Sequence, residues 1–193
     1  MNKLIGPAGG VETILMKKCH RLRAEGKSAL RLLLYGPPGT GKTDLANRVA
    51  RDLAGHEMGI ESINGANVTA EVVREWQSTM RTATLWSDWR VLVINEGDRI
   101  SQQAQVIMLT LLDELPPCRA VVVTSNQSLD EMVERFQSRM QQFEVGPPGL
   151  AEISEFLQRM NVPEAQADAI AIGAKGNVRS AILDAESYLD CAA

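Results

Sequence analysis

Blocks of hydrophobic and polar residues alternate along the chain and predict strands separated by helices. Continuous apolar runs rich in Val, Ile and Leu indicate strands buried on both faces. Apolar residues three and four positions apart indicate the intervening helices. The expected strands are 30–35, 60–63, 90–95, 120–124 and 141–145. The expected helices are 11–25, 42–53, 70–84, 102–112 (capped by Ser101) and a short one near 130–135. Strands that alternate with helices imply an α/β fold around a parallel sheet with right-handed crossovers.

A change of pattern follows the last expected strand. Gly146-Pro147-Pro148-Gly149 interrupts the chain, and only helical patterns come after it, at 150–160, 164–174 and 178–190. We therefore expect two domains, an α/β core over 1–148 and a small helical domain over 149–193. Because the second piece is too short to be stable by itself, it should pack on the core.

The segment Gly36-Pro37-Pro38-Gly39-Thr40-Gly41-Lys42-Thr43 matches the phosphate-binding loop G-x-x-x-x-G-K-[ST]. An expected strand precedes it and an expected helix follows, as the motif requires. Glycines let backbone N–H groups close around a triphosphate, and the helix N-terminus favours the same anion. Lys42 should reach the β- and γ-phosphates, and the Thr43 hydroxyl should bind Mg²⁺. The sequence thus predicts a nucleoside triphosphate site.

Polar residues at the ends of two other strands predict the chemistry beside this loop. Asn95 and Glu96 end one buried strand, where most nucleotidases of this type carry Asp-Glu. Glu96 is expected to polarise the attacking water, and Asn95 to hold Mg²⁺ through water, more weakly than Asp would. Asp98 lies close enough in sequence to supply the missing charge. Asn126 would face the γ-phosphate if its strand lies between the other two, whereas a routine turn is the alternative for that segment.

Composition sets limits on the kind of protein. The chain has 193 residues and a formal net charge of −4. Residues 1–31 hold seven Lys and Arg against two Glu, so the remainder carries about −9. This basic segment suits a nucleic-acid backbone or, as we favour, the solvated face of a helix. The scattered residues Cys19, Cys118 and Cys191 predict neither disulfides nor a zinc site, and they favour a cytoplasmic location.

The remaining residues that singly suggest a site are interpreted as structural. No apolar run is long enough to span a membrane, and the N-terminus lacks the apolar core of a signal peptide. His20 and His56 lack metal-ligand spacing. Trp76 is expected in the core, while Trp86 and Trp89 belong either to the core or to a surface that faces a partner.

Taken in order, the motifs resemble those of AAA+ ATPases, and within them the clamp-loader branch that includes the small subunits of replication factor C. The resemblance runs from about residue 4 to residue 190, and Leu4-Ile5-Gly6 resembles the segment that closes over adenine in that family. The motifs that carry it are Gly36–Thr43, Ile94-Asn95-Glu96, Thr124-Ser125-Asn126, Gln137-Ser138-Arg139-Met140 and Gly176-Asn177-Val178-Arg179.

The resemblance implies a five-stranded sheet of order 5-1-4-3-2 with a three-helix lid, and it implies ATP or ADP and Mg²⁺ as ligands. Arg139 would be an arginine finger acting in trans on a neighbour's nucleotide, and Arg179 a sensor on the lid with Asn177 as N-cap. The alternatives are a surface Arg139 near Glu134 or Glu144 and a surface Arg179. The implied catalytic residues are Glu96, Asn126, Arg139 and Arg179; the metal site is Thr43 and, through water, Asn95. The implied nucleotide-binding residues are Ile5, Gly6, Gly36, Pro37, Pro38, Gly39, Thr40, Gly41, Lys42, Thr43, Asp44 and Arg179.

Three functions stay open from the sequence. The first is a Mg²⁺-dependent ATPase coupled to DNA replication or other DNA metabolism, working in an oligomer or hetero-oligomer with other AAA+ subunits, with or without direct DNA contact and away from membranes. The second is a nucleotide switch that hydrolyses slowly because of Asn95. The third is an AAA+ protein of the helicase-loader or transposition-regulator type. Since the sequence stops at Ala193, soon after the lid, we do not expect the collar domain of clamp-loader subunits.

Overall fold

The computed structural model describes residues 4–82, 86–126 and 132–192. Its centre is a five-stranded sheet in which every paired strand is parallel, in the order β2-β3-β4-β1-β5. This confirms the predicted order, because β4 lies between the phosphate-loop strand β1 and the strand β3. The strands are β1 (Leu30–Tyr35), β2 (Ile60–Asn64), β3 (Arg90–Asn95), β4 (Arg119–Ser125) and β5 (Gln141–Glu144).

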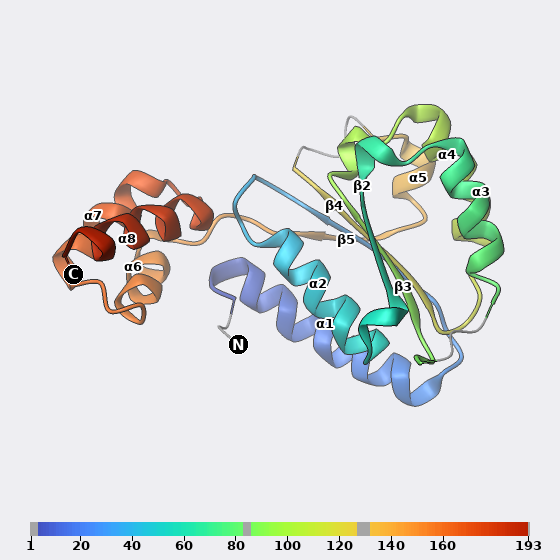
Figure 1. Cartoon of the computed structure of the whole chain (residues 1–193), viewed down its shortest axis with the longest axis horizontal. Helices are drawn as coiled ribbons and strands as arrows, with labels where there is room; N and C mark the ends of the chain where they lie inside the picture. Colours follow the sequence, from blue (N-terminus) through green and yellow to red (C-terminus); the bar gives the residue numbers. More distant parts are fainter. Residues whose placement is uncertain (1–3, 83–85, 127–131, 193) are drawn as a thin grey trace.

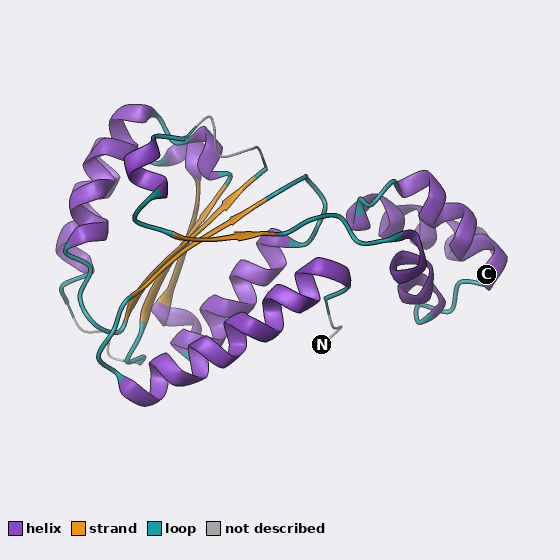
Figure 2. Ribbon diagram, turned by 180° about the vertical axis from the view of Figure 1, so that it is seen from behind, coloured by secondary structure: helices purple, strands orange, loops and turns teal. Residues whose placement is uncertain are grey.

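Helices cover both faces of this sheet (Figures 1 and 2). α1 and α2 pack on one face, and α3, α4 and α5 pack on the other. The helices of the core are α1 (Gly6–Glu25), α2 (Lys42–Ala54), α3 (Ala70–Thr79), α4 (Gln102–Asp113) and α5 (Glu134–Gln137). Three short 3₁₀ turns, which the periodicity does not predict, are η1 (Glu57–Gly59), η2 (Gly65–Asn67) and η3 (Gly97–Arg99).

The three central strands β1, β3 and β4 are mostly apolar because both of their faces are buried, whereas the edge strands β2 and β5 are largely polar. Along β1, Leu32 and Leu34 join the cluster under α1 and α2, while Leu33 joins the cluster under α3 and α4. All three side chains are fully buried. The parallel register of these strands places the carboxyl ends of β1, β3 and β4 side by side, with Tyr35 opposite Ser125 and Ile94 opposite Val123.

Several boundaries differ from expectation. α1 begins at Gly6 rather than residue 11, because Gly9 packs so closely on the chain that a Cβ there would lie 2.6 Å from the Leu4 carbonyl oxygen. α3 ends at Thr79, and residues 83 and 84 of the predicted helix lie outside the described residues. The short helix near 130–135 is instead α5 at Glu134–Gln137, and residues 130 and 131 of that prediction lie outside the described residues. Ser101 does cap α4, since its hydroxyl accepts from the Ala104 N–H at 3.2 Å.

Three helices follow β5 and form a separate group beside the α/β core (Figure 1). They are α6 (Leu150–Gln158), α7 (Glu164–Ala174) and α8 (Val178–Ala192), called here the helical lid. The lid has its own apolar cluster, which includes Ile153, Leu157 and Ile170, and against which Ile5 of the N-terminal segment also packs. The Gly-Pro-Pro-Gly segment thus precedes a group of helices that has an apolar cluster of its own.

The tryptophans fall into two groups. Trp76 and Trp89 are buried, and the Trp76 indole donates to Glu61 Oε1 at 2.6 Å. Trp86 is 66% exposed, and its ring stacks on His56.

In the described parts of the chain, no helix has both the length and the apolar character needed to cross a membrane.

Candidate functional site

The loop between β1 and α2 has a backbone path that depends on glycine. Gly36, Gly39 and Gly41 have φ angles of 141°, 78° and 91°, in the range that other residues rarely adopt. A Cβ on Gly36 would lie 2.4 Å from the Val145 carbonyl oxygen. Gly41 is also the N-cap of α2, so the loop leads directly into a helix N-terminus. This combination of a glycine loop and a helix N-terminus is suited to an anion.

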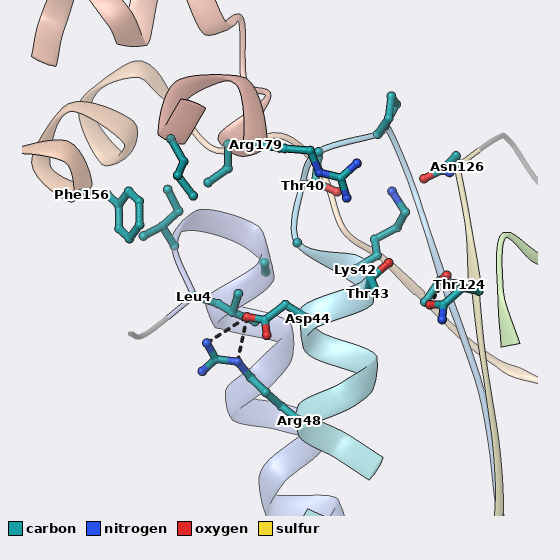
Figure 3. A pocket seen from close by; sticks show the side chains of 18 of the residues that line it. Leu4, Thr40, Lys42, Thr43, Asp44, Arg48, Thr124, Asn126, Phe156 and Arg179 are labelled. Atoms are coloured by element: carbon teal, nitrogen blue, oxygen red, sulfur yellow. Dashed lines mark hydrogen bonds and ion pairs between the residues drawn. The ribbon is translucent and has the colours of Figure 1, made fainter. Parts of the chain in front are cut away.

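A cavity of about 620 Å³ opens above this loop (Figure 3). Four separate parts of the chain line it, namely the N-terminal segment, the phosphate loop with α2, the ends of β3 and β4, and the lid. Its apolar side includes Leu4, Ile5, Ala8, Phe156, Ile182 and Leu183. The predicted residues that line it are Ile5, Pro38, Gly39, Thr40, Gly41, Lys42, Thr43, Asp44, Asn95, Glu96, Asn126 and Arg179. Gly36 and Pro37 belong to the loop but do not line the cavity. Gly6 does not line it either, and a Cβ on Gly6 would lie 2.7 Å from Pro148 Cβ.

Lys42 is a buried cation at the centre of the site. Its side chain is only 4% exposed, and Nζ donates to the Pro37 carbonyl at 2.6 Å. Burial lowers the pKa of Lys42 from 10.5 to about 8; the charge of Asp98 opposes this change, and that of Arg179 adds to it. A desolvated ammonium of this kind gains most from an anion placed beside it.

Glu96 lies at the end of β3 in a left-handed backbone conformation, with φ of 56°. Its Oε2 accepts from Asn64 Nδ2 at 3.0 Å and lies 3.3 Å from Arg99 Nε. Asn64 is the last residue of β2 and stands opposite Asn95 in the sheet register. Asn64 was not among the predicted site residues, although a polar residue at the end of a neighbouring parallel strand is a usable signal.

Asn95 and Asn126 occupy neighbouring strand ends. The Asn95 amide donates to Ser62 Oγ at 3.3 Å and accepts from the Thr124 hydroxyl at 3.5 Å. The Asn126 N–H donates to Asp98 Oδ1 at 3.0 Å, so this carboxylate holds the end of β4. Asp98 does not line the cavity, and the predicted compensation for Asn95 is therefore not a direct one.

The lining of the cavity fits the expected ligands. The cavity joins a glycine cradle and a desolvated cation to an apolar wall, which fits a nucleotide. Oxygen donors from Thr43 and Asn95 fit Mg²⁺, which prefers oxygen and usually takes few protein ligands beside phosphate. Within the described ranges, no three His, Cys, Asp or Glu side chains form a group that holds a metal unaided.

The lid touches the phosphate loop directly. The Val178 N–H donates to the Gly39 carbonyl at 3.0 Å, and a Cβ on Gly39 would lie 1.9 Å from Asn177 Oδ1. Asn177 is the N-cap of α8, as predicted, because its Oδ1 accepts from the Ser180 N–H at 3.1 Å. Arg179, one residue after the start of α8, is thereby brought to the cavity (Figure 3).

Arg139 lies away from the cavity of its own chain. Its Nε donates to Asp113 Oδ1 at 2.7 Å, and the pair is partly exposed. Asp113 therefore replaces Glu134 and Glu144, the partners considered from the sequence. The hydrogen bond from Arg139 holds the pKa of Asp113 below its usual value.

Comparison with known proteins adds to this geometry. The family model "ATPase family associated with various cellular activities (AAA)" matches residues 32–147. The chain is 28% identical to the replication factor C small subunit of Aeropyrum pernix, over 82% of this chain and 52% of that protein. It is 26% identical to replication factor C subunit 5 of Arabidopsis thaliana, over 78% of this chain and 44% of that protein. The chain thus spans about half the length of these relatives.

Solved structures share the fold. A RuvB variant from Thermotoga maritima superposes with a TM-score of 0.80 and 21% identity, over 97% of this chain and 63% of that one. A DNA polymerase III gamma subunit-related protein from the same organism superposes with a TM-score of 0.66 and 12% identity, over 94% of this chain and 58% of that one. At these identities the likeness concerns the fold alone.

Proposed function

The chain belongs to the AAA family of ATPases, and on this premise we propose that it binds ATP and hydrolyses it with Mg²⁺ in a clamp-loader-like role in DNA replication. One observation carries the proposal: a phosphate loop, a carboxylate at the sheet edge and a lid arginine all line one cavity. The core (1–148) and the lid (149–193) act as two domains that meet at this cavity.

Each residue has a separate role in the proposed reaction. Lys42 and the N–H groups of the loop bind the terminal phosphates, and the apolar wall with Ile5 holds the base. Glu96 orients and deprotonates the attacking water, for which it exchanges its bond to Asn64 for one to water. Asn126 holds that water near the γ-phosphate, and Arg179 contributes charge from the lid.

Mg²⁺ would be held by Thr43 and, through water, by Asn95, and the ion would neutralise the charge of the phosphates. Because the Asn95 amide has no charge, the metal binds more weakly than it would at a carboxylate. This favours slow turnover, and a nucleotide switch is accordingly the second candidate function.

We propose that the active unit contains more than one AAA subunit. Arg139 is distant from its own cavity and reaches the nucleotide of a neighbour, where such a charge contributes about 10³–10⁵ in rate. The relatives are named as subunits of replication factor C, which supports an oligomer or hetero-oligomer.

The free thiols Cys19, Cys118 and Cys191 suit the reducing cytoplasm.

Turnover measurements test the proposal. ATP hydrolysis is measured with and without primed DNA for the wild type and for Lys42→Ala, with Lys17→Ala on the exposed side of α1 as the matched lysine control. We expect turnover that Lys17→Ala retains and Lys42→Ala abolishes. ATP binding without Lys42-dependent turnover, at any protein concentration and with DNA present, would favour the switch over the enzyme.

A further inference from the structure

One carboxylate that lines the cavity, that of Asp44, is given no role in the binding of phosphate or metal proposed above. Asp44 follows Thr43 on α2 and lines the cavity with its side chain 49% exposed. Arg48, one turn later, lines the same side and is only 9% exposed. The bottom of Figure 3 shows the two side chains together, below Leu4.

Arg48 fixes the direction of the Asp44 carboxylate. Its Nε and Nη2 contact the same oxygen, Oδ2, at 3.0 and 2.9 Å. Its Nη1 contacts Glu12 of α1 at 3.0 Å, which anchors the guanidinium at the interface of α1 and α2. Within the ranges that the structure describes, Asp44 Oδ1 has no hydrogen-bond donor, and it remains an acceptor at the edge of the cavity.

The position of this acceptor limits what it can bind. The apolar residues of the cavity suit a base, and the phosphate loop suits the phosphates, so the sugar of a nucleotide lies between them. Asp44 and Arg48 lie near the start of α2, whose N-cap Gly41 faces the apolar residues Leu4 and Ala8. A carboxylate repels phosphate and attracts neutral O–H donors, and in this part of a nucleotide the ribose hydroxyls are such donors.

We propose that Asp44, oriented by Arg48, accepts a hydrogen bond from a ribose hydroxyl and makes the site selective for ribonucleotides. The inference rests on the proposed nucleotide-binding function and adds the sugar to it. Hydrogen bonds to charged groups are the stronger ones, and since Asp44 is half-exposed we expect a discrimination of about tenfold.

Equilibrium binding to the full chain tests this. Dissociation constants are measured for ATP, 2′-deoxy-ATP and 3′-deoxy-ATP with the wild type, Asp44→Ala and Asp190→Ala, the last being an exposed aspartate on α8 as the matched control. The wild type and Asp190→Ala should bind at least one deoxy analogue about tenfold more weakly than ATP. The analogue affected identifies the hydroxyl. In Asp44→Ala the ratio should fall to below about twofold.

The ratio separates ribose recognition from charge repulsion. Loss of the Asp44 charge alone changes the affinity for all three nucleotides equally and leaves their ratio unchanged, and that result would overturn the proposal. Equal wild-type affinities for all three also overturn it, without any need for a variant to fold, while Lys42-dependent ATP binding still supports the nucleotide site. Absence of ATP binding to the wild type would instead contradict the proposed function itself.

Discussion

The buried charge of Lys42 is expected to lower the stability of the nucleotide-free protein and to favour the binding of nucleotide. It is buried, and its pKa is lowered from 10.5 to about 8. That difference corresponds to about 3 kcal/mol by which the folded chain disfavours the charged side chain at neutral pH. The phosphates of a bound nucleotide relieve this penalty, so the energy that destabilises the free protein is regained on binding.

The substitution Lys42→Met removes the charge and keeps most of the volume. Removal of the buried charge should stabilise the nucleotide-free variant by about 3 kcal/mol, and loss of the hydrogen bond to Pro37 should cost about 1 kcal/mol. We therefore expect the variant to be more stable than the wild type by about 2 kcal/mol at pH 7. For a chain of this size, that raises the melting temperature by about 4–8 °C. The stabilising effect of added ATP should disappear in the same variant.

The pH dependence tests the cause. Between the folded pKa of about 8 and the unfolded value of 10.5, the unfolded wild type binds more protons, so its stability rises with pH relative to the variant. The advantage of Lys42→Met should therefore be largest at or below pH 7 and mostly lost by pH 10. Urea unfolding of both proteins at the two pH values measures it. An advantage that is absent at pH 7, or that grows toward pH 10, refutes burial of the charged amine as its origin.

Three further substitutions test other parts of the site. Asn95→Asp should lower the Mg²⁺ concentration needed for half-maximal turnover and raise the rate; a metal titration that matches the wild type contradicts the role given to the missing charge. Gly39→Ala should destabilise the chain by about 1–3 kcal/mol and weaken nucleotide binding, because its Cβ meets Asn177 and its φ is 78°; thermal melts and ATP titration measure both. Arg139→Ala subunits should regain turnover when mixed with Lys42→Ala subunits, which keep Arg139; mixtures as inactive as the separate variants argue against catalysis in trans.

Much of the core follows from the sequence, for an identifiable reason. β1 and β3 have the bounds that their apolar runs predict, because a strand buried on both faces is apolar at most of its positions. α1 was predicted five residues late, since Gly6, Gly9 and Gly10 are weak helix formers. The start of α1 depends on the close packing of Gly9 against Leu4, and the spacing of apolar residues in the sequence carries no information about such packing.

The sequence identifies the residues of the site better than their partners. Residues of the phosphate loop, Glu96 and Arg179 all line the cavity, and each belongs to a motif with its own spacing. The contact between Asn64 and Glu96 depends on the register of β2 against β3, which the short strand β2 does not specify locally. The Arg48 contact with Asp44 has an i,i+4 spacing and was in principle detectable.

The contact between the lid and the loop explains why the site must be considered as one unit. Gly39 accepts a hydrogen bond from Val178, and the same short turn places Arg179 at the cavity. A movement of α8 that shifts Arg179 therefore also changes the bonding of the phosphate loop. Because Gly39 has no side chain to separate the two segments, a nucleotide bound at the loop would be coupled to the position of the lid through this backbone contact. No motif in either segment shows this, since it exists only when the core and the lid are folded together.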